Sequence, residues 1–244
     1  MGVIYSGNGV RRAYGIRDLH RLRGLGSWPR IAIDTYTKSL LHFDGSLGDE
    51  ANKVWTAYGN AGVSDAQSKF GGYSCYFDGN QDYLTAEFTE LAGYAGDVTI
   101  ECWFKLAGTP TGTAYNTSYY IFSGGTLTAN PGIDFAIGNT HIWFNQTDYV
   151  VRLLSGAWTP NLNWNHVAVT RYGNVWNLWL NGTSIASATS SISITSTLST
   201  ACIGRCEPPG GETGGSYNGY IDEFRVSKGI ARWTADFTPP TEPY

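Results

Sequence analysis

The stretch DVTIECWFKL, residues 97–106, has the side-chain alternation of a β-strand. Successive side chains of a strand point to opposite faces of its sheet. One face would carry only apolar groups and the other a mixture that includes charges. We therefore predict a half-buried strand with these two sets of residues: Val98, Ile100, Cys102 and Phe104 on one face, and Thr99, Glu101, Trp103 and Lys105 on the other.

Similar short runs recur from Ser39 onward, separated by Gly, Asn, Asp or Pro, which is typical of a β-sandwich. With 14% aromatic residues, 31 Gly and only 15% charged residues, the composition suits strands and tight turns and argues against disorder. Asn181-Gly182 predicts a two-residue hairpin turn. Further strands are predicted at Tyr73–Phe77, Tyr119–Ser123, His141–Asn145, His166–Arg171, Val175–Leu180, Ala201–Gly204 and Tyr220–Val226.

Charge is distributed unevenly along the chain. Residues 1–30 carry six Arg and one Asp, a net charge of +5, although the whole chain has 16 basic and 20 acidic residues. The remainder therefore has a net charge of −9. A basic arm before an acidic body can bind nucleic acid, a membrane surface or an acidic protein. Interleaved apolar residues favour a protein partner, and a solvated tail is the alternative. The residues predicted to dock are Arg11, Arg12, Arg17, Arg21, Arg23 and Trp28.

The N-terminus and the cysteines indicate the compartment. Residues 1–30 lack the continuous apolar stretch of a secretory signal, so we expect no export by that route. The four cysteines, Cys75, Cys102, Cys202 and Cys206, are too sparse for a disulfide scaffold and are expected to be mainly small buried hydrophobes. A Cys75–Cys102 bridge is the alternative.

Six short motifs occur in an order that resembles the concanavalin A-like lectin/glucanase superfamily, in its laminin G-like branch. The resemblance covers roughly residues 39–244 and implies an all-β, two-sheet antiparallel jelly-roll sandwich. The segment 229–241 is similar to versions of this domain in tailed-bacteriophage virion proteins. The motifs are LLHFDG (40–45), SKFGG (68–72) with YFDG (76–79), VTIECWF (98–104), WNHVAV (164–169), LWLNG (178–182) and GYIDEFRV (219–226).

The carboxylates argue against an enzyme. Relatives in the superfamily that hydrolyse glycans place two carboxylates two residues apart on one strand, where they share a face. No two acidic residues of this chain have that spacing. The neighbours Asp222 and Glu223 are predicted to point to opposite faces. No histidine lies in a catalytic or metal-binding motif, so we predict a protein without a catalytic residue.

Calcium is the cofactor that the resemblance favours, because many such jelly rolls join their first and last strands through this ion. Asp44 and Asp222 are the predicted ligands, completed by backbone carbonyls of residues 45–48, with Asp49 or Glu50 as additional donors. The alternative is that both carboxylates only accept hydrogen bonds from turn amides.

Aromatic side chains in loops are the candidates for sugar contact, since sugar C–H faces stack on rings while hydroxyls need polar partners. One cluster surrounds residues 115–120 and another surrounds residues 143–149, and two further Trp residues are predicted to be exposed. The predicted carbohydrate-binding residues are Tyr115, Tyr119, Trp143, Tyr149, Trp158 and Trp176.

Together these features predict a non-enzymatic bacteriophage virion protein, assembled in the host cytoplasm. The role would be head decoration, tail fibre or tail adhesin. Residues 1–35 would form a basic docking arm for capsid or tail proteins, and residues 36–244 a laminin G-like sandwich with affinity for a host-surface glycan. We expect no nucleic acid or membrane partner, while self-association remains open. The alternative is a free carbohydrate-binding module of a bacterial surface or secreted protein.

Overall fold

A computed structural model provides the structure of the chain. It describes the backbone of residues 5–6 and 9–10 and then residues 33–113, 117–124, 133–146, 152–194, 198–205 and 215–244. The chain divides into two units, Met1–Ala32 and Ile33–Tyr244. In the first unit, β1 (Tyr5–Ser6) pairs antiparallel with β2 (Gly9–Val10). The residues predicted to dock, Arg11, Arg12, Arg17, Arg21, Arg23 and Trp28, lie outside the described residues.

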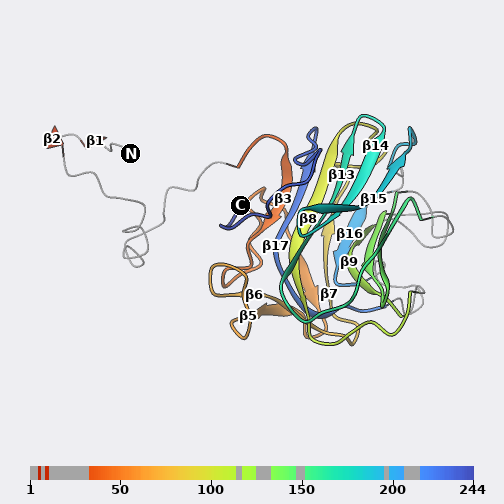
Figure 1. Ribbon diagram of the computed structural model, residues 1–244. Coiled ribbons are helices and arrows are strands. Elements are labelled where there is room, and N and C mark those ends of the chain that lie inside the picture. The colour runs from red at the N-terminus through yellow and green to blue at the C-terminus, as the bar shows by residue number, and fades with distance from the viewer. Residues whose placement is uncertain are drawn as a thin grey trace. The chain divides into compact units, whose positions relative to one another are not determined.

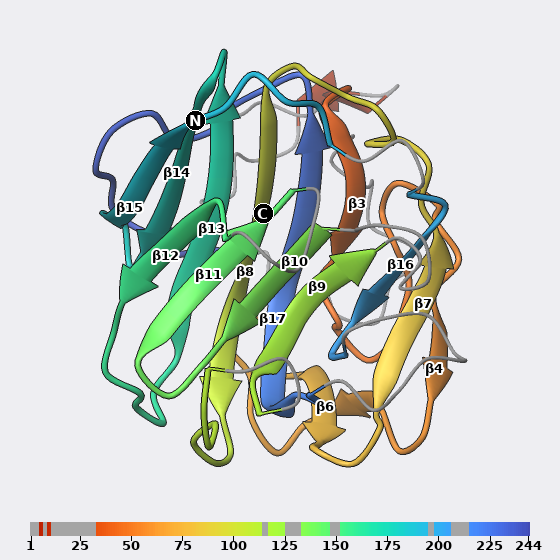
Figure 2. The same cartoon turned by 90° about the vertical axis from the view of Figure 1, so that its right-hand side faces the viewer.

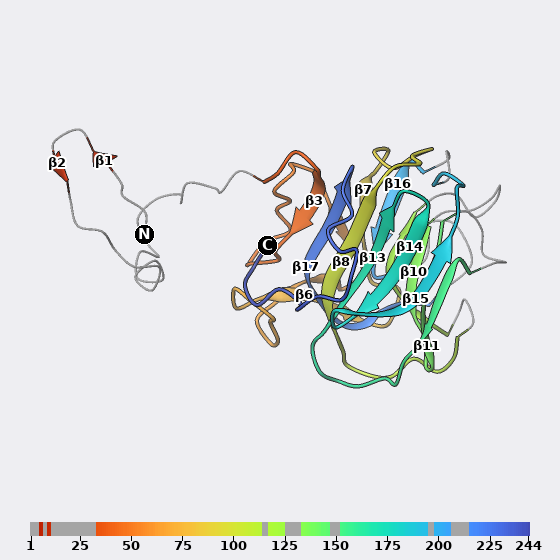
Figure 3. The same ribbon diagram turned by 45° about the horizontal axis from the view of Figure 1, so that its top comes forward.

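The second unit is an all-β sandwich of two antiparallel sheets, as predicted. Figure 3 shows the sheets as two facing layers, and Figures 1 and 2 together label their strands. One sheet has eight strands: β15 (Thr183–Thr189), β14 (Val175–Leu180), β13 (Asn165–Tyr172), β8 (Val98–Leu106), β17 (Asn218–Lys228), β6 (Ser74–Asp78) and β5 (Gly62–Ser64) in that order, with β3 (Thr37–Leu41) also paired to β17.

The other sheet has seven strands and faces the viewer in Figure 2. In spatial order they are β12 (Leu154–Ala157), β11 (His141–Asn145), β10 (Ile133–Ile137), β9 (Tyr119–Gly124), β16 (Thr200–Ile203), β7 (Tyr83–Glu87) and β4 (Thr56–Tyr58). Among the described residues, no helix has the length and apolar character needed to cross a membrane.

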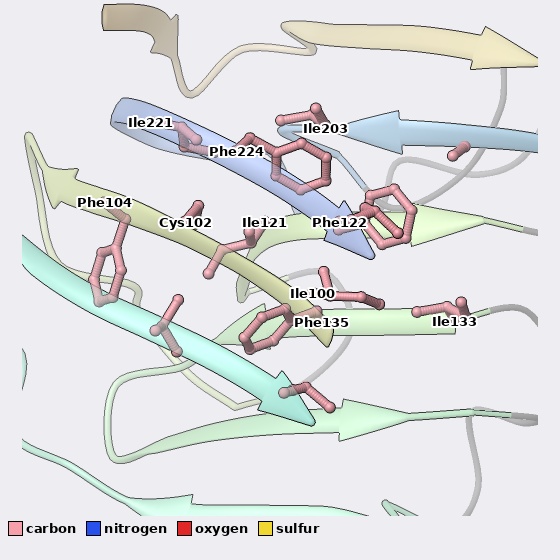
Figure 4. Packing of buried hydrophobic residues seen from close by; sticks show 14 of the residues in the cluster. Ile100, Cys102, Phe104, Ile121, Phe122, Ile133, Phe135, Ile203, Ile221 and Phe224 are labelled. Carbon is pink, nitrogen blue, oxygen red and sulfur yellow. The ribbon is translucent and has the colours of Figure 1, made fainter. Parts of the chain in front are cut away.

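Strand β8 lies between β13 and β17 and supplies the centre of the core. Its apolar set is fully buried between the sheets, which confirms the predicted alternation. Figure 4 shows Ile100, Cys102 and Phe104 of β8 in the space shared with Phe122 and Phe135 of the opposite sheet. Cys75 and Cys102 are separate, buried thiols, so the alternative of a bridge between them is wrong.

The outer face of β8 is buried as well, so the prediction of a half-exposed strand is wrong. Glu101 is 0% exposed and Trp103 is 6% exposed. The cover is the C-terminal segment Gly229–Tyr244, which follows β17 and which we call the C-terminal strap. Its Trp233 and Phe237 rings stack at 3.9 Å, and Phe237 also meets the rings of His166 and Trp179.

The predicted hairpin turn is confirmed and also holds the strap. Asn181 and Gly182 have φ of 50° and 83°, and they connect the paired residues Leu180 and Thr183. Phe237 N–H donates to the Gly182 carbonyl oxygen at 2.9 Å. A Cβ at position 182 would collide with the Phe237 carbonyl. Glycine is therefore required here for the turn and for the close approach of the strap.

Charged groups of the eight-stranded sheet pair with each other beneath the strap. Both Nε and an Nη of Arg225 donate to Glu101 Oε1, at 2.8 and 2.6 Å. Trp233 Nε1–H donates to the other Glu101 oxygen at 2.9 Å. Burial alone would raise the pKa of Glu101, but the hydrogen bond with His166 and the charge of Arg225 outweigh it and hold that pKa at about 2.

A β-bulge changes the predicted directions of Asp222 and Glu223. The register between β17 and β8 shifts between Asp222 and Arg225, while Ile221 and Phe224 both enter the core. Two residues of β17 therefore stand where the partner strand has one, and both carboxylates lie outside the core. The prediction of opposite faces is wrong, because alternation fails at a bulge.

Glu101→Gln is expected to lower the free energy of unfolding by about 3 kcal/mol. The substitution leaves the largely buried guanidinium of Arg225 without a counter-charge. The folded pKa of Glu101 is about 2 and the ordinary value is 4.5. Its charged form therefore contributes stability that is complete above pH 4.5 and lost as the pH falls toward 2. Urea unfolding of both proteins across this range measures the difference, which should shrink as the pH falls.

Glu87→Gln is the matched control, because Glu87 is exposed on β7. It should change the unfolding free energy by less than about 0.5 kcal/mol. Equal effects of the two substitutions would contradict the structural role of Glu101.

Candidate functional site

A line of small polar side chains crosses the outer face of the seven-stranded sheet, and we call it the polar row. The neighbours of its members along each strand, such as Phe135 and Phe144, point into the core, so the row points away from it. Direct cross-strand pairing on β11, β10, β9, β16 and β7 joins the members in this order: Asn145, Asp134, Ser123, Cys202 and Thr85.

Two members of the polar row have buried polar atoms without hydrogen-bond partners in the described structure. These atoms are Asn145 Oδ1 and Thr85 Oγ1. Asn145 is only 3% exposed. Buried polar groups of native proteins are nearly always hydrogen-bonded, and a bound ligand or water commonly supplies the partner when the chain does not. The unsatisfied atoms therefore mark the polar row as a candidate ligand-binding site, in which Ser123, Asp134 and Cys202 are at most 2% exposed.

Aromatic side chains flank the polar row near β11. Tyr120, Ala136 and Trp143 form a small cluster separate from the main core, with the two rings edge to face at 6.5 Å. Direct pairing places Ala136 opposite both Tyr120 and Trp143. The exposed Arg152 covers the Trp143 ring, with its guanidinium carbon 4.1 Å from the ring centroid.

A second aromatic group lies near the β7 and β4 end of the row. Tyr58 and Tyr83 stack at 4.7 Å, and Tyr58 is 40% exposed. The guanidinium of Arg205 lies 5.5 Å from the Tyr83 ring, and its buried Nε has no hydrogen-bond partner in the described structure. Rings and hydrogen-bonding groups thus occur at both ends of the polar row. Such a combination suits a ligand with apolar C–H faces and many hydroxyls.

The predicted carbohydrate-binding residues do not come together in one place. Trp143 lies beside the polar row, while Tyr119 is half-buried with its ring 5.8 Å from Tyr217. Trp158 and Trp176 are 8% and 0% exposed, so the prediction that they are exposed is wrong. Trp158 packs edge to face on Phe104, and Trp176 stacks on Phe144, because the backbone directs both rings inward. Tyr115 and Tyr149 lie outside the described residues.

Sequence reasoning missed Asp134, Thr85, Arg152 and Arg205. Alternation along β10 and β7 could have assigned Asp134 and Thr85 to the outer face. It could not have placed them in one row, because this requires the register of strands that are far apart in the chain. For the two arginines, the sequence contains no pattern that indicates their positions over rings.

The predicted calcium ligands both lie against segment 69–72. Asp222 accepts backbone N–H groups of Lys69 at 2.7 Å and Phe70 at 3.2 Å, as the alternative prediction stated for turn amides. Burial raises the pKa of Asp222 to about 7 despite these hydrogen bonds. A Cβ at Gly71 would collide with the Asp44 carboxylate. In the described part of the chain, no three His, Cys, Asp or Glu side chains form a metal-binding group. Most of the six to eight oxygens around calcium would therefore have to be carbonyls or water.

One protein-family model, described as "Concanavalin A-like lectin/glucanases superfamily", matches residues 78–232, which is more than half of the chain. No curated protein matches the chain in sequence.

Solved structures with similar folds include several domains attached to carbohydrate-active or toxin proteins. Domain 4 of AbnA, an extracellular GH43 arabinanase from Geobacillus stearothermophilus solved with arabinotriose, has a TM-score of 0.61 and 18% identity, covering 80% of this chain and 94% of that one. The botulinum neurotoxin serotype D binding domain has a TM-score of 0.55 and 13% identity, covering 79% and 48%. A Trypanosoma rangeli sialidase mutant has a TM-score of 0.56 and 11% identity, covering 82% and 32%. At these identities the likeness establishes the fold.

Calcium binding at Asp44 and Asp222 remains a prediction that thermal unfolding can test. If the ion binds there, added calcium should raise the Tm of the full chain by mass action. Asp222→Asn should abolish that rise, while Asp236→Asn, a change on the strap, should retain it. A Tm that does not respond to millimolar calcium would contradict the site.

Proposed function

The chain belongs to the concanavalin A-like lectin/glucanase superfamily, and from this membership we propose that its sandwich is a non-catalytic carbohydrate-binding module. The polar row carries the proposal. Asn145 Oδ1 and Thr85 Oγ1 are buried acceptors that a sugar hydroxyl could satisfy. The Trp143 and Tyr58 ends of the row supply aromatic groups beside them.

The similar domains support a glycan as the ligand. The arabinanase domain was solved in complex with arabinotriose. Botulinum neurotoxin type C also has a similar fold, and its cell entry depends on interaction with two ganglioside molecules. That toxin chain matches with a TM-score of 0.56 and 16% identity. These ligands belong to those proteins, and their common carbohydrate chemistry is what we propose for this chain.

The spacing of carboxylates on the same face supports a binding role without catalysis. Asp134 lies in the polar row, and Glu87 is the next outward-facing carboxylate on the described strands of this sheet. Three strand spacings and two residues separate them, which corresponds to roughly 16 Å. Glycosidases hold their two carboxyl groups about 5 to 9.5 Å apart. We therefore propose that the module holds sugar without cleaving it.

The virion location and the docking role of the basic arm remain predictions. The similar structures named above come from a glycosidase, bacterial toxins and a sialidase. This set is closer to the alternative, a carbohydrate-binding module of a bacterial surface or secreted protein, and we adopt that alternative as the proposed function.

Binding of oligosaccharides to the full chain tests the proposal. Glycan arrays identify a ligand, starting with arabinotriose, and isothermal titration then measures its Kd. Asn145→Ala should weaken binding about three- to tenfold, because it removes one hydrogen bond to sugar. Thr85→Val, which removes a hydroxyl but keeps the shape, should act in the same direction.

Asn177→Ala is the matched control, since Asn177 lies half-buried on β14 of the other sheet. It should leave the Kd unchanged. The absence of binding to any arrayed glycan at millimolar concentration would overturn the carbohydrate-binding proposal. Normal binding by Asn145→Ala and Thr85→Val would show that the polar row does not contribute to sugar binding.

A further inference from the structure

Arg152 covers the ring of Trp143, which is only 2% exposed. Its guanidinium carbon lies 4.1 Å from the centroid of the indole. One Nη donates to the Thr113 carbonyl oxygen, while the side chain as a whole is exposed. A guanidinium has five N–H donors in one plane, so this arrangement holds the group flat while leaving donors available at its edge.

Arg152 shares with Arg171 and Arg205 the lack of an ion pair with a described carboxylate, whereas two other arginines of the sandwich have such a pair. Arg225 pairs with Glu101 and Arg232 pairs with Asp34. Among the described residues, no carboxylate lies within ion-pair distance of Arg152. Residues 31–244 carry 19 acidic side chains against 10 basic ones. The lack of a described carboxylate beside Arg152 is therefore not explained by a shortage of acidic residues.

The neighbouring groups are those of a binding surface. Asn145, with its unsatisfied buried Oδ1, lies two residues from Trp143 on β11, and both point outward. Asp134 lies on the adjacent strand opposite Asn145, two residues before Ala136, which faces Trp143. The carboxyl group of Asp134 is thus displaced along the strands from the ring on which Arg152 stacks.

We propose that the sugar recognised beside Trp143 carries a carboxylate, as a uronic or sialic acid does, and that Arg152 binds this group. The inference rests on the proposed carbohydrate-binding function and specifies its ligand class. A stacked guanidinium matches a planar carboxylate with two parallel N–H···O bonds. Asn145 Oδ1 accepts a hydroxyl of the same sugar. The carboxylate of the sugar supplies a counter-charge to Arg152, which the described residues of the chain do not supply.

The test compares acidic sugars with neutral counterparts of the same skeleton. The probes are trigalacturonate with its methyl ester, and 3′-sialyllactose with the methyl ester of its sialic acid, titrated into the full chain. At least one acidic sugar should bind about ten- to a hundredfold more tightly than its neutral counterpart, which is the range expected for charge-assisted hydrogen bonds. This preference should weaken as sodium chloride is added.

Arg152→Gln should abolish the preference for the acidic sugar over its neutral counterpart. Arg152→Lys keeps the charge but loses the planar fork, so it should restore only part of the preference. Lys38→Gln, which removes a partly exposed positive charge on β3 of the other sheet, is the matched control and should retain it. Equal Tm values for the four proteins would show that the changes do not act through unfolding.

The outcomes separate this inference from the function on which it rests. Equal binding of acidic and neutral sugars, or a preference that survives in Arg152→Gln, overturns the role of Arg152 and leaves the carbohydrate-binding function intact. Binding of neutral arabinotriose, or of 3′-sulfolactose, which carries a sulfate and no carboxylate, without binding of either carboxylated sugar, overturns the carboxylate assignment. Failure of every sugar to bind overturns the proposed function itself.

Discussion

The buried carboxylate of Glu101 on the central strand β8 constrains much of the sandwich. An ionised group at 0% exposure is tolerated only with counter-charges and hydrogen bonds around it. Arg225 comes from the adjacent strand β17, His166 from β13 and Trp233 from the C-terminal strap. One carboxylate therefore connects three strands of the sheet to the segment that covers them. Gly182, in the hairpin between β14 and β15, then lets the strap lie close enough to complete this cover.

The pairing of charged residues differs between the two outer faces of the sandwich. On the eight-stranded sheet, charges pair with one another beneath the chain's own C-terminal strap. On the seven-stranded sheet, Arg152 and Arg205 lie over aromatic rings and have no carboxylate partner among the described residues. The buried acceptors of Asn145 and Thr85 on that face also lack partners in the described structure. Unsatisfied buried atoms also occur on the eight-stranded sheet, at Trp103 Nε1 and His166 Nδ1. The two faces therefore differ in how their charged groups are paired, and not in the presence of unsatisfied polar atoms.

The aromatic residues show why the candidate site was harder to predict than the fold. Trp143 and Trp176 are both tryptophans in strands with similar composition, yet the first lies on the outer face and the second stacks in the core. The side of the sheet on which a ring lies depends on whether odd or even residues of the strand face the core. For β14 we predicted that Trp176 faces outward, whereas it faces the core. The prediction for Asp222 and Glu223 was wrong for a related reason. A β-bulge interrupts the alternation there, and the residue types do not indicate its position.

The sequence by itself determined the all-β class, the inward set of β8 and the turn at Asn181-Gly182, because alternation and turn chemistry are local properties of a few residues. Only the tertiary structure decided that residues of β11, β10, β9, β16 and β7 form one polar row. Strand β16 pairs with β9 and β7, although long segments of chain separate it from both. Strand order and register come from packing between distant segments, and a short sequence pattern contains no information about which strand lies beside it.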